Sequence, residues 1–197
     1  SLHDALPICG GSISAYVGAL GISLGTMVAN LSSHKKGWDE QWKYFGDWAL
    51  KGQMLKKEML RLVDEDTKAF NKIMLAFTLP KGTDDEKKLR TEAIQDATKY
   101  AILTPFKVME LCYQSMELLK EMTENGNPNS VTDAAVGALC ARTGVMGAFL
   151  NVKINAAGLN DKAFVQKIIA DGQQIQDNAI KLEQEIIAIT NAKIAVN

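Results

Sequence analysis

Residues 59–77, MLRLVDEDTKAFNKIMLAF, contain the pattern on which the fold prediction rests. In and just before this stretch, apolar residues recur at the three- and four-residue spacing of one helix face, namely at Leu55, Met59, Leu62, Phe70, Ile73 and Phe77. Asp66 completes the series between Leu62 and Phe70. The spacing therefore predicts a long helix whose buried stripe contains one carboxylate.

A carboxylate at such a position needs an explanation. Burying an ionised carboxylate without a partner costs several kcal/mol. A structural explanation is an ion pair with a Lys or an Arg, for example Arg142, or a contact with a helix cap. A functional explanation is that Asp66 takes part in chemistry, and the spacing alone leaves both open.

The composition indicates one soluble globular domain. The chain has 197 residues, of which 23% are charged and 47% hydrophobic, and its net charge of -1 gives no basic field for nucleic acid. The three cysteines, Cys9, Cys112 and Cys140, are scattered without the spacing of metal ligands. They suit a reducing cytosol, so we expect a cytoplasmic protein without a metal, a nucleic-acid partner or a membrane.

Residues 1–8, SLHDALPI, differ in character from the rest of the chain. They resemble the translation of a common sequencing adapter, and a truncated glycine codon at the junction would read as cysteine. We therefore expect residues 1–8 to be non-native, Cys9 to replace a glycine, and upstream sequence to be missing. Residues 9–197 are expected to form the helical domain.

Residues 10–33 carry no charge. Their length would allow a membrane span, but more than half are Gly, Ala, Ser or Thr, which are poor lipid-facing residues. We expect a central helix whose small residues let neighbouring helices approach, at Ala15, Ala19, Gly25 and Ala29. Its start, Gly10-Gly11-Ser12, leaves amide groups free for an anion or a carbonyl oxygen, although a plain turn would look the same.

The remaining sequence predicts further helices. One spans residues 38–78, and the next begins after a capping box at Thr83 and Glu86 and is kinked or split near Pro105. Two more cover about residues 130–156 and 161–191, the last as a covering helix or half of a dimer seam. No segment alternates like a strand, so the fold class is all-α, an antiparallel bundle of five to six long helices.

The helix at residues 130–156 is nearly all small and apolar, so its polar residues stand out. They include Asp133, Arg142, Asn151 and Asn155, of which the two asparagines lie one turn apart on one face. Each has a structural alternative, because Asp133 can cap the helix and asparagines can bond to nearby backbone.

Several motifs resemble the folate cyclodeaminase/cyclohydrolase family. They are GGSISAYVGALGISLGTMVANL, LVDEDTKAFNKIM, LPKGTDDEKKLRTEAIQDATKYA, GNPNSVTDAAVGAL and GAFLNVKIN, in that order from Gly10 to about Asn178. The segment SSHKKGWDEQW is most similar to the cyclodeaminase half of a bifunctional formimidoyltransferase-cyclodeaminase. The family's opening motif usually has three glycines, where this chain has Cys9-Gly10-Gly11, and His34 stands where many members have glycine.

The resemblance implies an activity. It is the conversion of 5-formimidoyltetrahydrofolate to 5,10-methenyltetrahydrofolate with release of ammonia, in histidine degradation. The substrate is a tetrahydrofolate derivative, polyglutamylated forms included, and no tightly bound cofactor is expected. The resemblance also implies a homo-oligomer, either a dimer or a larger ring, and a fused upstream formimidoyltransferase domain.

The same resemblance implies site residues. The second Asp of the family's V-D-x-D-x-x-A-F motif is the proposed catalytic group, and in this sequence it is Asp66. Lys35 could meet the glutamate tail, although a solvated turn explains it equally well, and carboxylate and amide groups could bond to the pterin ring. The expected folate-binding residues are Gly10, Gly11, Ser12, Asn30, Lys35, Asp133, Asn151 and Asn155. Methenyltetrahydrofolate cyclohydrolase activity and a non-catalytic assembly module remain as alternatives.

Overall fold

The computed structural model describes residues 9–194. It contains the helices α1 (Gly10–Ser33), α2 (Trp42–Thr78), α3 (Asp84–Asn125), α4 (Val131–Ala156) and α5 (Lys162–Ile194), and the short 3-10 helices η1 (Asp39–Gln41) and η2 (Pro128–Ser130). The described residues include no strand, which confirms the all-α prediction. The segment predicted to be non-native, residues 1–8, lies outside them.

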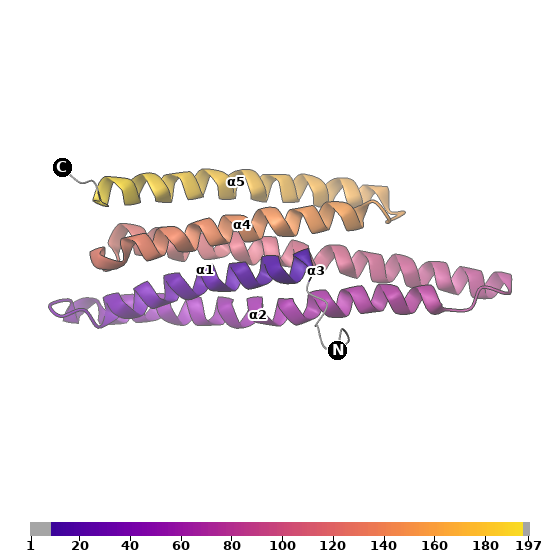
Figure 1. Ribbon diagram of the computed structural model, residues 1–197, viewed down its shortest axis with the longest axis horizontal. Coiled ribbons are helices and arrows are strands. Elements are labelled where there is room, and N and C mark those ends of the chain that lie inside the picture. The colour runs from indigo at the N-terminus through magenta and orange to yellow at the C-terminus, as the bar shows by residue number, and fades with distance from the viewer. Residues whose placement is uncertain (1–8, 195–197) are drawn as a thin grey trace, which may run out of the picture.

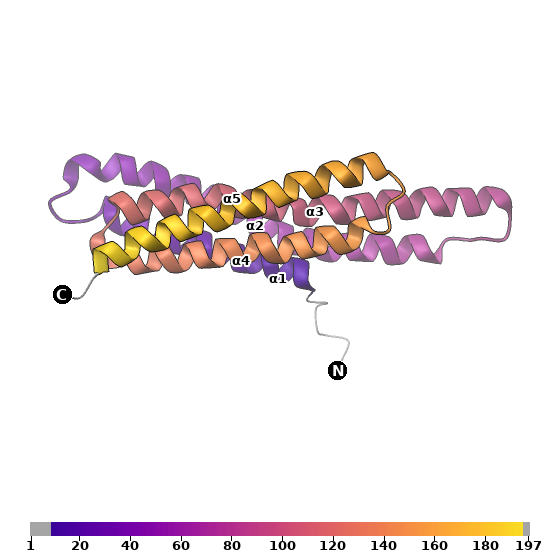
Figure 2. The same ribbon diagram turned by 90° about the horizontal axis from the view of Figure 1, so that it is seen from above.

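The helices form an up-and-down bundle covered by a fifth helix. Helix α1 packs against α2 and α4, and α3 packs against the same two helices, so four antiparallel helices enclose the core. Helix α5 lies across α3 and α4, as Figures 1 and 2 show. The covering role predicted for the last helix is thus confirmed.

Helix α1 is deeply packed because its side chains are small. Ala15, Ala19, Gly25 and Ala29 are all buried, as predicted. Where α1 crosses α4, a Cβ on Gly21 would lie 2.7 Å from the carbonyl oxygen of Gly137, so only glycine permits this approach. Two helical segments, Gly10–Ser33 and Pro128–Ala156, are long and apolar enough to cross a membrane. Both pack against neighbouring helices of the bundle, as core helices do.

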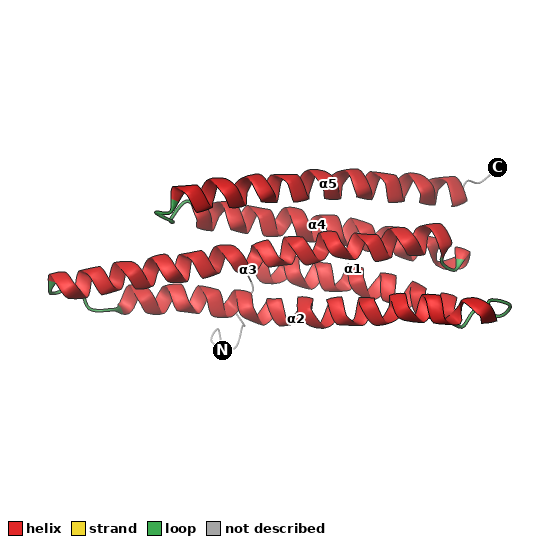
Figure 3. Cartoon of the chain, turned by 180° about the vertical axis from the view of Figure 1, so that it is seen from behind, coloured by secondary structure: helices red, strands yellow, loops and turns green. Residues whose placement is uncertain are grey.

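Helices α2 and α3 are longer than their neighbours and extend as a hairpin beyond the first residue of α1 (Figures 1 and 3). Leu55, Met59 and Leu62 of α2 are buried, but Phe70 is 52% exposed and Phe77 is 51% exposed. The predicted buried stripe is therefore wrong at Phe70 and Phe77, because α1 begins beside Asp66 and no longer covers this face, whereas Ile73 is half-buried.

Helix α3 begins and continues for identifiable reasons. The predicted capping box is confirmed, since the Thr83 side chain accepts from the amide of Glu86 and the Glu86 side chain accepts from that of Thr83. Of the two alternatives predicted near Pro105, a kink or a split, the split is wrong, because α3 runs through this proline as one helix. Proline has no N–H to donate to the carbonyl of Ala101. Asn155 of α4 supplies that donor, with its Nδ2 at 2.8 Å from the Ala101 oxygen.

Candidate active site

Asp66 lies where α2 passes the N-terminus of α1. Its exposed fraction is 9%, and Ser12 donates its hydroxyl to Oδ2 at 2.9 Å. The thiol of Cys9 also donates to Oδ2. Oδ1 lies against Gly11, where a Cβ would be only 2.2 Å away. The carboxylate is thus packed directly on the first turn of α1.

The first turn of α1 adds an electrostatic contribution. Cys9 occupies the N-cap position without a side-chain cap to the helix, and the first amide bonded to the N-cap carbonyl is that of Ile13, at 3.1 Å. Among the residues that the structure describes, none accepts a hydrogen bond from the amides of Gly10, Gly11 or Ser12. The positive end of the helix therefore favours a negative charge at Asp66 or on a ligand beside it.

Two asparagines of α4 complete the polar side of the site. Asn151 donates Nδ2 to the carbonyl of Gly147 at 2.9 Å, and its amide also packs against Gly10. Asn155 donates Nδ2 to the carbonyl that Pro105 leaves free. Each of these bonds uses one of the two N–H groups of its amide, and no described residue donates to either Oδ1 atom, so both remain as acceptors. The carbonyl of Ala101, which Pro105 leaves without a donor in α3, thus holds the Asn155 side chain in place.

A cavity of about 110 Å³ connects these groups. It lies between the N-terminus of α1 and helices α2, α3 and α4, and it is lined by Cys9, Asp66, Ala69, Phe70, Ile73, Ala101, Asn151 and Asn155. Sites for small molecules usually measure about 300–1,000 Å³. This cavity would therefore take the reacting part of a larger ligand, while the rest lies on the open surface.

No cation neutralises Asp66 within residues 9–194. None of the ion pairs of the described residues includes it, and Arg142 instead lies 3.7 Å from Glu183 of α5. The suggested pair between Asp66 and Arg142 is therefore wrong. Asp66 accepts hydrogen bonds from neutral groups only, so its negative charge is supported by α1 without being paired.

Five of the expected folate-binding residues, Gly10, Gly11, Ser12, Asn151 and Asn155, are brought together around Asp66. The other three are not. Asn30 is exposed near the end of α1, roughly 30 Å from Gly10 along the helix. The Lys35 Nζ lies 3.8 Å from the centroid of the Trp38 ring, and Asp133 lies in the first turn of α4, at the same end of the bundle as Asn30.

Sequence reasoning missed two features of the site. Phe70 lines the cavity, but the helical spacing assigned it to the core. Ala101 supplies the carbonyl that anchors Asn155, and the position of Pro105 four residues later was the signal that could have identified it. In the described part of the chain, no cluster of three or more His, Cys, Asp or Glu side chains could hold a metal ion.

Comparisons with known proteins identify the family to which the chain is similar. Residues 5–174 match the protein family described as formiminotransferase-cyclodeaminase. A methenyltetrahydrofolate cyclohydrolase of Methylorubrum extorquens is 34% identical over 94% of this chain and 89% of its own length. The rat formimidoyltransferase-cyclodeaminase is 33% identical over 80% of this chain, which spans 29% of the length of that relative.

A solved structure shows the same fold. The formiminotetrahydrofolate cyclodeaminase of Thermotoga maritima superposes with a TM-score of 0.81 over 93% of this chain and 87% of its own, at 23% identity. This likeness confirms the helical fold, and the family match together with the relatives above confirms the resemblance inferred from the motifs. With most of its length matched, this chain belongs to the formiminotransferase-cyclodeaminase family.

Proposed function

We propose that the chain is a formimidoyltetrahydrofolate cyclodeaminase, in which Asp66 transfers the proton that ring closure requires. In this reaction, folate N10 attacks the amidine carbon on N5 and gives a tetrahedral centre. The bond from that carbon to the terminal nitrogen then breaks, and the nitrogen leaves as ammonia. N10 loses a proton and the leaving nitrogen gains one, so one side chain can serve both steps.

The observation that carries this proposal is the state of Asp66. Its carboxylate is 9% exposed and lines a cavity, and no cation of the described residues pairs with it. A structural ion pair therefore does not explain it. Its negative charge can stabilise the amidinium form of the substrate, and this effect is larger in a site from which water is mostly excluded. The two Oδ1 acceptors of Asn151 and Asn155 suit the amino and N–H donors on the edge of a pterin ring.

A second reaction is favoured by a specific finding. The relative from Methylorubrum extorquens is named a methenyltetrahydrofolate cyclohydrolase, and the match covers 89% of that protein. In that reaction, water would attack the methenyl carbon and Asp66 would take one of its two protons. The bond from the carbon to N5 would then break, with N5 gaining the remaining hydroxyl proton as the carbonyl of the 10-formyl compound forms. The segment SSHKKGWDEQW supports the cyclodeaminase reaction instead, by its resemblance to the bifunctional enzymes.

The wider proposals rest on the resemblance. We infer a cytoplasmic enzyme of histidine degradation, which accepts polyglutamylated folates and whose gene encodes an upstream transferase domain. We also infer a homo-oligomer, because α1 has no charged residue yet exposes Ile13, Tyr16, Leu20 and Leu31. Exposed apolar residues on the adjacent α4 extend this surface, namely Val136, Leu139, Leu150 and Ile154. The molar mass in solution tests this inference.

Asp66→Asn is the test of the proposed function. The amide keeps the shape of the side chain but cannot carry the proton, so turnover should fall by roughly 1,000-fold. Ammonia release and the methenyl chromophore should be measured with 5-formimidoyltetrahydrofolate, and loss of that chromophore with 5,10-methenyltetrahydrofolate. The second assay separates the two reactions. A cyclohydrolase consumes the methenyl compound, whereas a cyclodeaminase forms it from the first substrate.

Asp64→Asn is the matched control, since Asp64 lies on the same helix but is exposed. It should retain the activity of the unmodified chain with each substrate. Wild-type turnover in Asp66→Asn, together with a loss of thermal stability, would instead support a structural carboxylate in a non-catalytic assembly module.

A further inference from the structure

The apolar face of α2 continues from the candidate active site onto open surface. Helix α1 covers this face as far as Asp66, which packs on the first turn of α1 at Gly11. Figure 1 shows α2 continuing past the start of α1. One turn further along α2, Phe70 is 52% exposed although it shares the face of buried Met59 and Leu62. Several large apolar side chains are exposed on α2, and Phe70 is the one among them that lines the cavity beside Asp66.

Phe70 belongs to the site and to the surface at once. It lines the same cavity as Asp66, together with Ile73 of the next turn. The asparagines of α4 line that cavity as well, so an apolar wall and hydrogen-bond acceptors border one opening. This combination suits a flat molecule with an aromatic face and polar edges.

The size of the cavity limits how such a molecule can bind. About 110 Å³ cannot enclose a substituted bicyclic ring, so only its reacting edge can approach Asp66. The rest of the ring must lie outside the cavity, and Phe70 is the aromatic residue at its rim. Stacking of a planar heterocycle on an aromatic side chain typically contributes about a tenfold or larger gain in affinity.

We propose that Phe70 is the surface on which the planar pterin ring of the folate substrate stacks, and that this contact positions the reacting carbon beside Asp66. The inference rests on the proposed function, because it identifies the part of a folate that this side of the site recognises. Phe70 is a positioning residue in this proposal, since its ring neither donates nor accepts the proton that is transferred.

Two substitutions of Phe70 and one control test the proposal. Phe70→Ala removes the ring, and Phe70→Tyr keeps a stacking surface. Phe77→Ala removes a ring of similar exposure, 51%, on the same face of α2 but outside the cavity lining. Each variant should be compared for kcat and KM with 5-formimidoyltetrahydrofolate, for calorimetric Kd with 5-formyltetrahydrofolate, and for molar mass.

The expected result is a selective loss of binding in one variant. Phe70→Ala should raise KM and Kd by about tenfold, because the stacking surface is lost, and it should also lower kcat, because the reacting carbon is held less precisely beside Asp66. Phe70→Tyr should retain the Kd of the unmodified chain, and so should Phe77→Ala. A wild-type Kd in Phe70→Ala would overturn the proposal.

Another occupant of this face would give a different pattern. If a second chain covers it, Phe70→Ala and Phe77→Ala should both lower the molar mass and affect binding equally, which would overturn the stacking proposal. Binding of 5-formyltetrahydrofolate needs no turnover. If binding depends on Phe70 but no turnover occurs, the proposed function alone is contradicted. If turnover occurs but Kd does not depend on Phe70, the stacking proposal alone is contradicted.

Discussion

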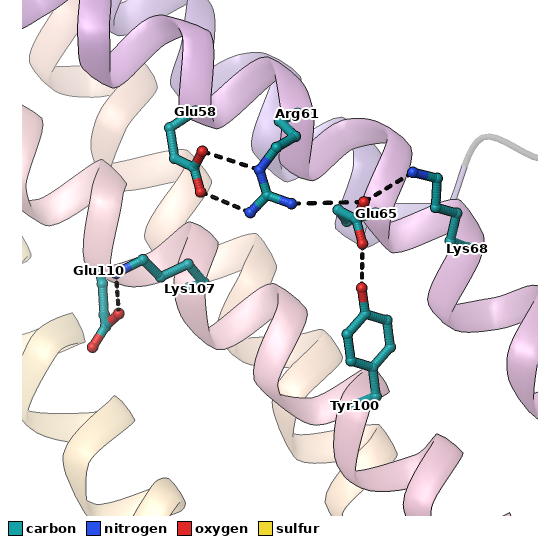
Figure 4. A network of polar contacts seen from close by, with 7 residues as sticks. All are labelled: Glu58, Arg61, Glu65, Lys68, Tyr100, Lys107 and Glu110. Carbon is teal, nitrogen blue, oxygen red and sulfur yellow. Dashed lines mark hydrogen bonds and ion pairs between the residues drawn. The ribbon is translucent and has the colours of Figure 1, made fainter.

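Asp66 and its neighbour in the sequence, Glu65, face different sides of α2 and have contrasting surroundings. Glu65 accepts from Lys68 at 2.9 Å and from the Tyr100 hydroxyl, and Arg61 lies 3.6 Å away (Figure 4). Its carboxylate is thus held between two cations and a residue of α3. Asp66 contacts only neutral donors and the start of α1.

The pKa values on the Glu65 side reflect this pairing. The hydrogen bond from Tyr100, followed by that from Lys68, holds the pKa of Glu65 below its ordinary value. The same hydrogen bond, followed by burial, raises the pKa of Tyr100. Glu65 therefore connects α2 to α3, whereas the carboxylate of Asp66 can contact a ligand.

The difference shows how a structural acid can be told from a reactive one on the same helix. Changes around Asp66 should alter activity with little change in stability. Changes around Glu65 should alter stability with little change in activity. Three substitutions test this division, in order of decreasing effect.

Gly11→Ala should have the largest effect. The new Cβ would lie 2.2 Å from Oδ1 of Asp66, so the carboxylate or the start of α1 must move. Displacement of a reacting group by about 1 Å can cost roughly 100-fold in kcat/KM, which is the loss we expect. Gly46→Ala is the control, because no atom lies within 4 Å of its new Cβ. It should retain activity and gain about 0.5–1 kcal/mol of stability.

Ser12→Ala should have an intermediate effect. It removes the hydroxyl that donates to Oδ2 of Asp66 at 2.9 Å. This bond helps to hold the carboxylate in place, and loss of that positioning should lower kcat/KM by about tenfold. Ser23→Ala removes a hydroxyl that bonds only to the backbone of its own helix, at Ala19. If both variants lose the same activity, the Ser12 contact has no special role.

Tyr100→Phe should have the smallest effect and should spare kcat. Loss of the bond to Glu65 should lower Tm by about 2–4 °C in a chain of this length. Tyr113→Phe, also on α3, serves as the control. A large loss of kcat in Tyr100→Phe with unchanged Tm would contradict the division between the two acids.

The pH dependence of unfolding adds a second measurement on Tyr100→Phe. Because the pKa of Glu65 is lowered in the folded chain, its contribution to stability is present above its ordinary pKa and is lost as the pH falls through the folded value. Removing the main cause of that shift should move the acid midpoint of unfolding to higher pH. An unchanged acid midpoint would mean that the Tyr100 bond does not stabilise the ionised form of Glu65.

Much of the fold could be predicted because helices are encoded locally. The three- and four-residue spacing identified the helices, and the Thr83 capping box fixed one boundary. Asp66 could be selected for the same reason, since a polar residue in an apolar series is visible without any knowledge of its neighbours. The Gly10-Gly11-Ser12 start could likewise be identified as a helix end with free amides.

Other features depend on how far neighbouring helices overlap, which no local pattern contains. Phe70 continues the spacing of Met59, yet it is exposed because α1 begins at Gly10. Asn30 lies on the same helix as Ser12 but roughly 30 Å away from Gly10, so it does not reach the site within this chain.

The sequence by itself therefore determined which residues form helices and which carboxylate is out of place among apolar neighbours. Only the tertiary structure decided that Arg142 pairs with Glu183 instead of Asp66, and that Asn155 occupies the carbonyl freed by Pro105. The physical reason is that helical spacing arises from bonds between residues three or four apart, whereas a side chain's partner depends on the lengths and alignment of helices far apart in the chain.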